Sequence, residues 1–357
     1  MPRSRTISPA ALCFVLCLLA GLAPGCSRTG ARIAAPPSSL GSVTSSGVVL
    51  NEDFTGRAIF PPNNWWNLDV SQAPVDPASQ SIIDWISGRT PQNPGATVRL
   101  HPDFGPPPYG IPYVGVSGTQ PLLPVTFNPY GSESDPGAPG RPAGYPIPDE
   151  ARTLAGYIEG GVAGGGQSGD RHLLVIDRDH GLLFETWATH WNAGSARWEA
   201  GSGAAFDLAT NGRRPEGWTS ADAAGLAIFP GLVRYDEVFG TAEIRHALRC
   251  TVRATNGEVW PASHTAGSTA GAPPLGAHLR LKAVKDLSSY PPEVQKIFRA
   301  MKTYGLMVAD NGSDVFVSGT MDARWNNDVL NPAFHSLHAD DFDVIELGWG
   351  RPTTSVP

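Results

Sequence analysis

Residues 171–187, RHLLVIDRDHGLLFETW, carry the clearest indication of the fold class. Two runs, 171–177 and 182–187, are rich in Leu, Val, Ile, Phe and Trp, and such residues pack well on a pleated, half-buried surface. The four residues between them end in glycine, which suits a hairpin connection. The stretch therefore predicts two strands that pair as an antiparallel hairpin.

Short apolar runs of this kind recur along the chain, which contains 41 glycines and 34 prolines in 357 residues. This spacing is typical of many short strands joined by turns. Asn311-Gly312 suits a two-residue turn, so the runs before and after it are expected to form a second hairpin. The other predicted strands follow the same pattern, and the full set is 247–252, 258–261, 278–283, 306–310, 314–318 and 343–347. The sequence thus predicts a mainly β fold, an antiparallel jelly-roll-like sandwich formed by one domain over residues 51–355.

Two peripheral helices are expected beside the strands. Residues 76–88 place an aspartate and a proline before three isoleucines and end in glycine, an order typical of a capped helix. Residues 291–304 repeat apolar side chains at helical spacing and are followed by Gly305.

The N-terminus predicts export. Residues 1–26 have a basic start and an apolar run, the layout of a secretory signal peptide, and this run is shorter than the roughly 20 residues of a spanning helix. The stretch LAPGC, residues 22–26, resembles the lipobox of bacterial lipoproteins, in which Cys26 is acylated. We expect a lipoprotein on the cell envelope, held to the membrane only by this lipid, with ordinary secretion as the alternative. Residues 27–50 predict a flexible tether.

Charge and cysteine content exclude several classes of function. The net charge is −7, and all acidic residues lie beyond residue 50, so the exported part lacks the basic balance of a nucleic-acid-binding protein. Only Cys250 would remain after export and lipidation, which leaves no internal disulfide. The sequence contains no nucleotide, dinucleotide or zinc signature, so no cofactor is predicted. The oxygen-rich loop 322–328, DARWNND, is a candidate calcium site without EF-hand spacing.

Carboxylates between residues 185 and 237 suggest glycoside hydrolysis, which requires two carboxyl groups on opposite sides of a sugar bond. Glu185 alternates with Trp187 along one strand face, and a carboxylic acid beside an indole can have a raised pKa and donate a proton. The candidate catalytic carboxylates are Glu185, Asp207, Asp222, Asp236 and Glu237.

Structural explanations compete with catalysis for these carboxylates. Thr219 and Asp222 have the spacing of a capping box at a helical turn. Residues 230–238 are predicted to form a strand, on one face of which Arg234 and Asp236 would meet as an ion pair. An exposed position at a sheet edge would equally explain Glu185.

Histidines and tryptophans support two further hypotheses. His172 or His246 could act as a base while Arg234 neutralises a uronate carboxylate, the arrangement of a polysaccharide lyase. Ten tryptophans are present, mostly among polar and glycine-rich residues, where an indole face suits a sugar ring. We therefore predict substrate-binding roles for Trp187, Trp218, Trp260 and His264. A non-catalytic carbohydrate-binding or envelope-interaction module remains the third alternative.

Six short stretches carry a resemblance to known sequences. They are HPDFG (101–105), YGIPY (109–113), GDRH (169–172), GWTSADAAGL (217–226), WPASH (260–264) and ADNGS (309–313). In this order they resemble an uncharacterised family of secreted bacterial and fungal proteins over roughly residues 60–345. The resemblance implies one continuous exported domain and implies neither an activity nor a catalytic residue.

Overall fold

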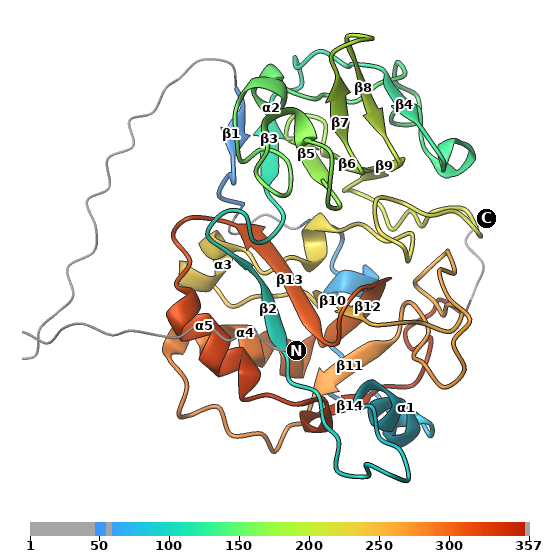
Figure 1. The fold of residues 1–357 in the computed structure, drawn as a ribbon, viewed down its shortest axis with the longest axis vertical. Helices are drawn as coiled ribbons and strands as arrows, with labels where there is room; N and C mark the ends of the chain where they lie inside the picture. The colour runs from blue at the N-terminus through green and yellow to red at the C-terminus, as the bar shows by residue number, and fades with distance from the viewer. Residues whose placement is uncertain (1–46, 55–58, 354–357) are drawn as a thin grey trace, which may run out of the picture. The chain divides into compact units, whose positions relative to one another are not determined.

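The hairpin predicted at 171–187 lies inside a five-stranded sheet in the computed structural model, which describes residues 47–54 and 59–353 (Figure 1). Its strands, β5 (Leu173–Asp177) and β6 (Leu182–Trp187), pair antiparallel as predicted. The sheet has the order β1-β3-β5-β6-β9. The other three strands are β1 (Val49–Leu50), β3 (Tyr113–Val116) and β9 (Ser202–Asp207).

Both faces of this sheet are covered. Val175 and Phe184 point into one core together with Trp198 of a three-stranded sheet, whereas Leu174 and Leu183 point into the larger core on the opposite face. Strands buried on both faces are continuously apolar, and this explains the composition of the hairpin. The smaller sheet has the order β4-β8-β7, formed by β4 (Val125–Phe127), β8 (Arg197–Ala200) and β7 (His190–Asn192).

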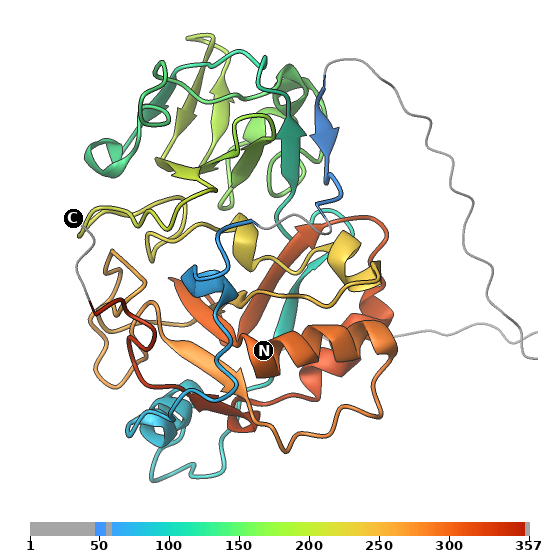
Figure 2. The ribbon, with the colours of Figure 1, turned by 180° about the vertical axis from the view of Figure 1, so that it is seen from behind.

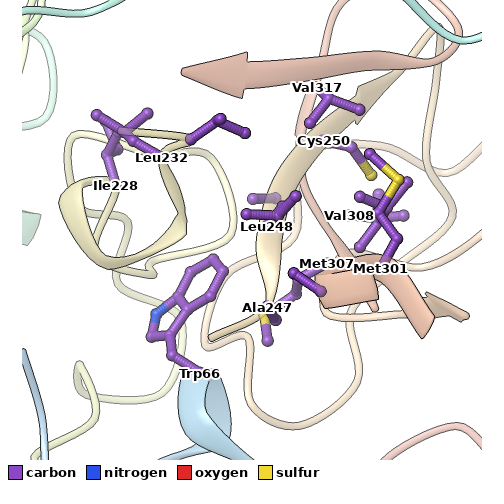
Figure 3. Close-up of a cluster of buried hydrophobic side chains, with 14 of the residues drawn as sticks. Trp66, Ile228, Leu232, Ala247, Leu248, Cys250, Met301, Met307, Val308 and Val317 are labelled. Carbon is purple, nitrogen blue, oxygen red and sulfur yellow. The ribbon is translucent and has the colours of Figure 1, made fainter. Parts of the chain in front are cut away.

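A six-stranded sheet forms the rest of the β structure, in the order β14-β11-β12-β10-β13-β2. Figure 2 shows α4 lying across it, and Figure 3 shows the buried side chains, among them Met301 of α4 and Cys250 of β10, that pack there. The strands are β2 (His101–Gly105), β10 (Leu248–Val252), β11 (His278–Leu281), β12 (Leu306–Asn311), β13 (Phe316–Met321) and β14 (Phe342–Val344).

The hairpin predicted around Asn311-Gly312 is wrong, although both of its strands exist. β10 lies between β12 and β13, parallel to the first and antiparallel to the second. All five residues of β10 are buried, so this strand belongs at the centre of the sheet, where it separates the two sequence neighbours. Gly312 donates its N–H to Val252 O (2.8 Å) instead of closing a hairpin.

The prediction of a mainly β sandwich fold is confirmed. The sheets are mixed, however, because β3–β5, β4–β8, β10–β12 and β13–β2 are parallel pairs, which the antiparallel prediction did not include. One predicted strand, 258–261, is wrong: Glu258 makes only an isolated bridge to Leu275. β1 also shows that the predicted tether, 27–50, ends in sheet structure, while Cys26 lies outside the described residues.

Both predicted helices are present, as α1 (Ser79–Ile86) and α4 (Pro292–Thr303). Asp76 accepts the N–H of Ala78 (2.7 Å) ahead of α1, and the apolar side of α4 is fully buried. Three short helices escaped prediction. α2 (Asp149–Thr153) and α3 (Tyr235–Phe239) have only five residues each, and α5 (Asn327–His335) contains a proline although its apolar residues have helical spacing. No helix within the described ranges is long and apolar enough to cross a membrane.

Candidate functional site

A row of polar side chains crosses one face of the six-stranded sheet. Asp103 of β2 lies opposite Ser318 of β13. Because Val317 pairs with Cys250 in antiparallel register, Arg249 of β10 is the next member of the row. Asp310 of β12 pairs with Thr251, two residues further along β10, and so shares this face. Four strands thus present an arginine, a serine and two carboxylates side by side.

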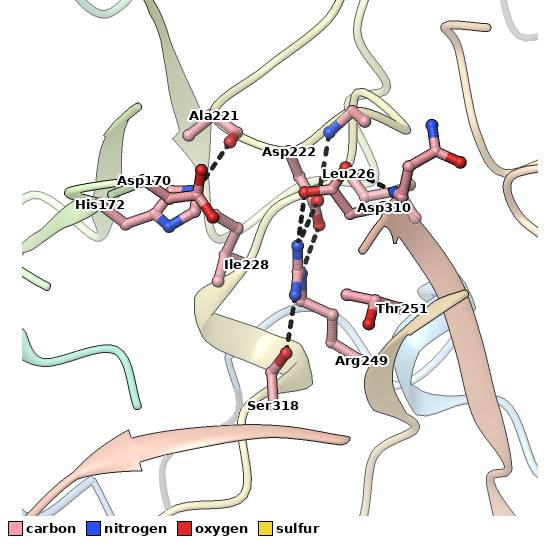
Figure 4. Close-up of polar contacts among 12 residues, drawn as sticks. Asp170, His172, Ala221, Asp222, Leu226, Ile228, Arg249, Thr251, Asp310 and Ser318 are labelled. Atoms are coloured by element: carbon pink, nitrogen blue, oxygen red, sulfur yellow. Dashed lines mark hydrogen bonds and ion pairs between the residues drawn. The ribbon is translucent and has the colours of Figure 1, made fainter. Parts of the chain in front are cut away.

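Arg249 is the centre of this row (Figure 4). Its side chain is 4% exposed, and its Nε and Nη2 donate to the two carboxylate oxygens of Asp222, at 2.9 and 2.8 Å. Nη1 donates to Ser318 Oγ (2.7 Å), and Nη2 also lies 3.1 Å from Asp310 Oδ2. A paired guanidinium with its donors satisfied is a rigid anchor, so Arg249 fixes the carboxylates around it.

Asp222 reaches Arg249 from the loop that follows β9, and the capping box predicted for this loop is wrong. Residues 217–225 form turns without a helix. Thr219 Oγ1 donates to Asp222 O (3.0 Å) instead of accepting an N–H, and the Asp222 carboxylate turns to the guanidinium. The charged bidentate partner is stronger than a neutral backbone N–H, which explains why the local motif does not form.

His172 holds the same loop from the five-stranded sheet. Its Nδ1 lies 2.7 Å from Glu159 Oε2, and its Nε2 lies 3.1 Å from Ala221 O, next to Asp222. Burial would lower the pKa of His172, but the Glu159 carboxylate outweighs it and raises this pKa to about 9. An imidazolium that donates from both nitrogens therefore links Glu159 to the loop.

Two carboxyl groups of the row remain half-buried. The side chain of Asp310 is 26% exposed, and burial together with the nearby Asp222 carboxylate raises its pKa to about 6. Burial also raises the pKa of Asp103, although Arg249 opposes this. Asp310 can therefore hold a proton near neutral pH, as a general acid must.

Polar and aromatic groups surround these carboxyls. The exposed Asp170 accepts the indole N–H of Trp187 (3.2 Å) and acts electrostatically on both Asp103 and His172. His264 Nδ1 lies 2.8 Å from Ala223 O, the residue after Asp222. Trp187 and His264 are both half-buried, so each can contact a ligand at the surface.

Glu185, the first predicted acid, lies in the interior at 0% exposure. Its carboxylate accepts the N–H of Ile228 (2.8 and 3.0 Å) and of Phe229 (2.8 Å), at the start of the 3₁₀ turn Phe229–Gly231. Burial raises the pKa of Glu185 to about 7 against these hydrogen bonds. This position holds a turn and does not meet a polysaccharide.

The strand predicted at 230–238 is wrong, since its second half is α3. Helical spacing brings Arg234 together with Glu237, three residues on, and the predicted ion pair with Asp236 is also present, with Arg234 Nε 3.9 Å from Asp236 Oδ1. His246 Nε2 completes the cluster 2.9 Å from Glu237 Oε2, and Asp236 accepts the N–H of Phe54 (2.9 Å). These four predicted residues form a polar cluster at the first turn of α3, separate from the contacts of Arg249.

The geometry does not favour the lyase hypothesis. Both ring nitrogens of His172 are engaged, and so are those of His246, which contact Glu237 and the Ala247 carbonyl (2.9 Å). Arg234 is 1% exposed, buried beside Glu237. Neither a free base nor an accessible arginine is available from this predicted set.

The remaining predicted residues are dispersed. Asp207 is exposed at the end of β9, where its Oδ1 accepts the N–H of Ala209 (2.9 Å) in the following turn. The Arg214 guanidinium lies over the ring of Trp218 (5.3 Å to its centroid), and Trp260 packs edge-on against Trp65 with centroids 6.0 Å apart.

In the candidate calcium loop, Arg324 donates to both oxygens of Asp322 (2.9 and 2.5 Å), so this carboxylate already has a cationic partner. Asn326 accepts the N–H of Asp328 (3.0 Å) as the N-cap of α5. Over residues 47–54 and 59–353, no group of three or more His, Cys, Asp or Glu side chains is arranged to bind a metal ion.

Sequence reasoning missed Asp103, Glu159, Arg249, Asp310 and Ser318 as site residues. Asp103 and Asp310 lie in two of the stretches that carry the resemblance, HPDFG and ADNGS. Two other such stretches, GDRH and GWTSADAAGL, contain His172 and Asp222. An aspartate that directly follows an apolar run, as Asp310 follows LMVA in β12, was the signal that could have identified the row.

No family model, curated protein or solved structure matches the chain.

Proposed function

We propose that the protein hydrolyses glycosidic bonds in a polysaccharide at the site around Arg249, with Asp310 as proton donor and Asp103 as the second carboxyl group. One observation carries this proposal: two half-buried carboxyls with raised pKa share a sheet face on either side of a buried Arg249–Asp222 ion pair. Glycoside hydrolysis needs one protonated and one ionised carboxyl around the bond.

Asp310 is suited to the acid role by its surroundings. Arg249 fixes its Oδ2 and the N–H of Asn311 contacts its Oδ1 (2.7 Å), so the carboxyl has a defined orientation. The proton of Asp310 passes to the glycosidic oxygen as the bond to the anomeric carbon breaks. Asp103 accepts a proton from the water that attacks this carbon, so the two carboxyls exchange protonation states.

The strand order favours inversion of the anomeric centre. β2 and β12 are three strand spacings apart, about 14 Å at about 4.8 Å per spacing, and Asp310 lies two residues further along the strands than Asp103, so the two backbones are about 16 Å apart. Retaining enzymes require carboxyl groups only about 5 Å apart, whereas inverting enzymes place them about 6.5–9.5 Å apart and so leave space for a water molecule. The wide separation speaks against a retaining pair, and direct attack by water requires the two side chains to lean toward each other across Arg249.

The aromatic groups nearby support a carbohydrate as substrate. Trp187 is half-buried next to Asp170, and the predicted Trp218 is half-buried on the loop that carries Asp222. An indole face stacks on the C–H face of a sugar while neighbouring carboxylates bind its hydroxyls.

A polysaccharide panel tests the proposed function. The full-length protein is incubated with neutral and uronate-containing polysaccharides, and each reaction is read both for new reducing ends and for the absorbance of unsaturated uronates. We expect reducing ends without unsaturated products from at least one polysaccharide. Unsaturated products would instead establish a lyase, and retention on a polysaccharide without any product would establish a binding module.

A further inference from the structure

A hollow of about 360 Å³ opens at the surface beside Trp260. Its lining includes Arg213, Glu216, Glu258 and Arg351 around the half-buried indole. The volume falls within the roughly 300–1,000 Å³ typical of ligand sites. An aromatic wall with polar groups of both signs is the composition expected for a hydroxyl-rich, ring-shaped ligand.

This hollow is connected to the proposed catalytic site by two adjoining segments, 213–218 and 258–264. Gly217 donates its N–H to Ser263 O (2.7 Å), and Ser263 Oγ donates to Trp218 O (3.0 Å). The second segment ends at His264, whose ring lies against Ala223 in the loop that carries Asp222. The four residue steps from Trp260 to His264 span at most about 14 Å, so the hollow lies a few sugar units from the loop that carries Asp222.

The cations of the hollow are largely engaged. Arg213 donates to Glu216 Oε2 (2.6 Å), to Pro261 O (2.9 Å) and to Ala262 O. The remaining arginine, Arg351, shares the lining with Glu258, since Glu216 is already paired with Arg213. A uronate carboxylate would therefore meet at least as much negative as free positive charge, whereas a neutral sugar can use donors and acceptors of both kinds.

We propose that the Trp260 hollow binds a neutral sugar unit of the same polysaccharide chain that reaches Asp310, so that the protein takes an extended neutral chain as its substrate. This inference rests on the proposed function. Trp260 stacks on the ring of the bound unit, while Glu258 and Arg351 hydrogen-bond its hydroxyls. Trp260 thereby has a substrate-binding role away from the catalytic carboxyls, and this role explains why its indole is half-exposed.

Affinity electrophoresis tests this inference. Full-length protein carrying Asp310→Asn, which cannot complete hydrolysis, is run through gels that contain barley β-glucan, xylan, galactomannan or polygalacturonate. We expect retardation in at least one neutral gel and none from polygalacturonate. Adding Trp260→Ala should raise the dissociation constant for the retarding polysaccharide about fivefold or more, because one stacking contact is lost.

Trp85→Ala is the matched control, because Trp85 of α1 is also a partly buried tryptophan, packed under the Arg253 guanidinium (3.7 Å to the ring centroid). It should leave the retardation unchanged, and thermal unfolding should confirm that both variants are folded. Equal retardation of Trp260→Ala and its parent, or retardation by polygalacturonate alone, would overturn the inference even if the wild-type protein releases reducing ends. Retardation that depends on Trp260, with no reducing ends from wild type, would contradict the hydrolase and leave the binding site in place.

Discussion

Asp222 and Arg249 form a buried bidentate ion pair, with N–O distances of 2.8 and 2.9 Å, that joins the loop after β9 to the centre of the six-stranded sheet. His172 holds the neighbouring Ala221 from the five-stranded sheet. The two contacts fix one loop between elements from different sheets. Asp310, the proposed proton donor, lies against this pair, so its orientation and its pKa depend on both partners.

Removing the charge of one partner of the Asp222–Arg249 ion pair should destabilise the fold. Asp222→Asn removes the charge that neutralises Arg249, whose side chain is 4% exposed. We expect a loss of about 3–5 kcal/mol in the free energy of unfolding, measured by urea titration, because the guanidinium stays buried with too little negative charge around it. Asp207→Asn, at the exposed end of β9, is the control and should change stability by less than about 0.5 kcal/mol. Equal stability of both variants would show that the pair does not anchor the loop.

Because of His172, the free energy of unfolding should decrease as the pH rises into the alkaline range. Its folded pKa, about 9, lies above the unfolded value of 6.5, so its contribution is complete below about pH 6.5 and is lost as the pH rises through about 9. A shift of this size corresponds to about 3 kcal/mol. His172→Gln should flatten this alkaline part of the curve of unfolding free energy against pH. An identical alkaline slope in the variant would contradict a charged His172.

Glu185 should make the free energy of unfolding depend on pH in a lower range than His172 does. Its folded pKa, about 7, is also above the unfolded value of 4.5, so its contribution is present below about pH 4.5 and decreases as the pH rises through about 7. Gln at this position can still accept the N–H groups of Ile228 and Phe229 without carrying a charge. Glu185→Gln should therefore gain stability relative to wild type between pH 5 and pH 8, as measured by chemical denaturation. A constant difference over this range would mean that Glu185 does not titrate there.

Hydrolysis should show a bell-shaped pH dependence. The rate should fall above about pH 6, as Asp310 loses its proton, and should also fall in acid as Asp103 becomes protonated, at a pH above the ordinary aspartate value. In Asp310→Asn the alkaline limb should disappear. Initial rates of reducing-end release across pH 3–9 measure both limbs, and an alkaline limb that persists in the variant would assign the acid to another group.

The products should initially have inverted anomeric configuration, because the strands of Asp103 and Asp310 are too far apart for a covalent intermediate on either carboxylate. Proton NMR of the first turnovers distinguishes the two anomers before they equilibrate. Retained configuration would exclude this pair and direct attention to carboxylates that lie closer together.

The strands were largely predictable from the sequence because local composition decides them. β5, β6, β10 and α4 follow directly from apolar runs and helical spacing. The order of the strands within a sheet was not predictable. β10 lies between β12 and β13 because it is the strand that buries both of its faces, and the local sequence does not show this. Local motifs also failed where a distant charge competed, as Arg249 does for the carboxylate of Asp222.

The candidate site was predictable only in part. His172 and Asp222 were named, but as a base and as a catalytic carboxylate, whereas the structure gives both of them buried ionic partners. Asp103 and Asp310 become neighbours of Arg249 only through the register of β2, β13, β10 and β12. Such register between distant strands is set by tertiary pairing and leaves no local pattern in the sequence.

The most direct test compares reducing-end release by wild type, Asp310→Asn and Asp207→Asn on one polysaccharide that wild type cleaves. Asp310→Asn should lower kcat by about 100-fold or more, the usual contribution of a general acid, with its fold intact by circular dichroism. Asp207→Asn should retain the wild-type rate. A wild-type rate in Asp310→Asn would contradict the central claim that the carboxyl beside Arg249 donates the proton.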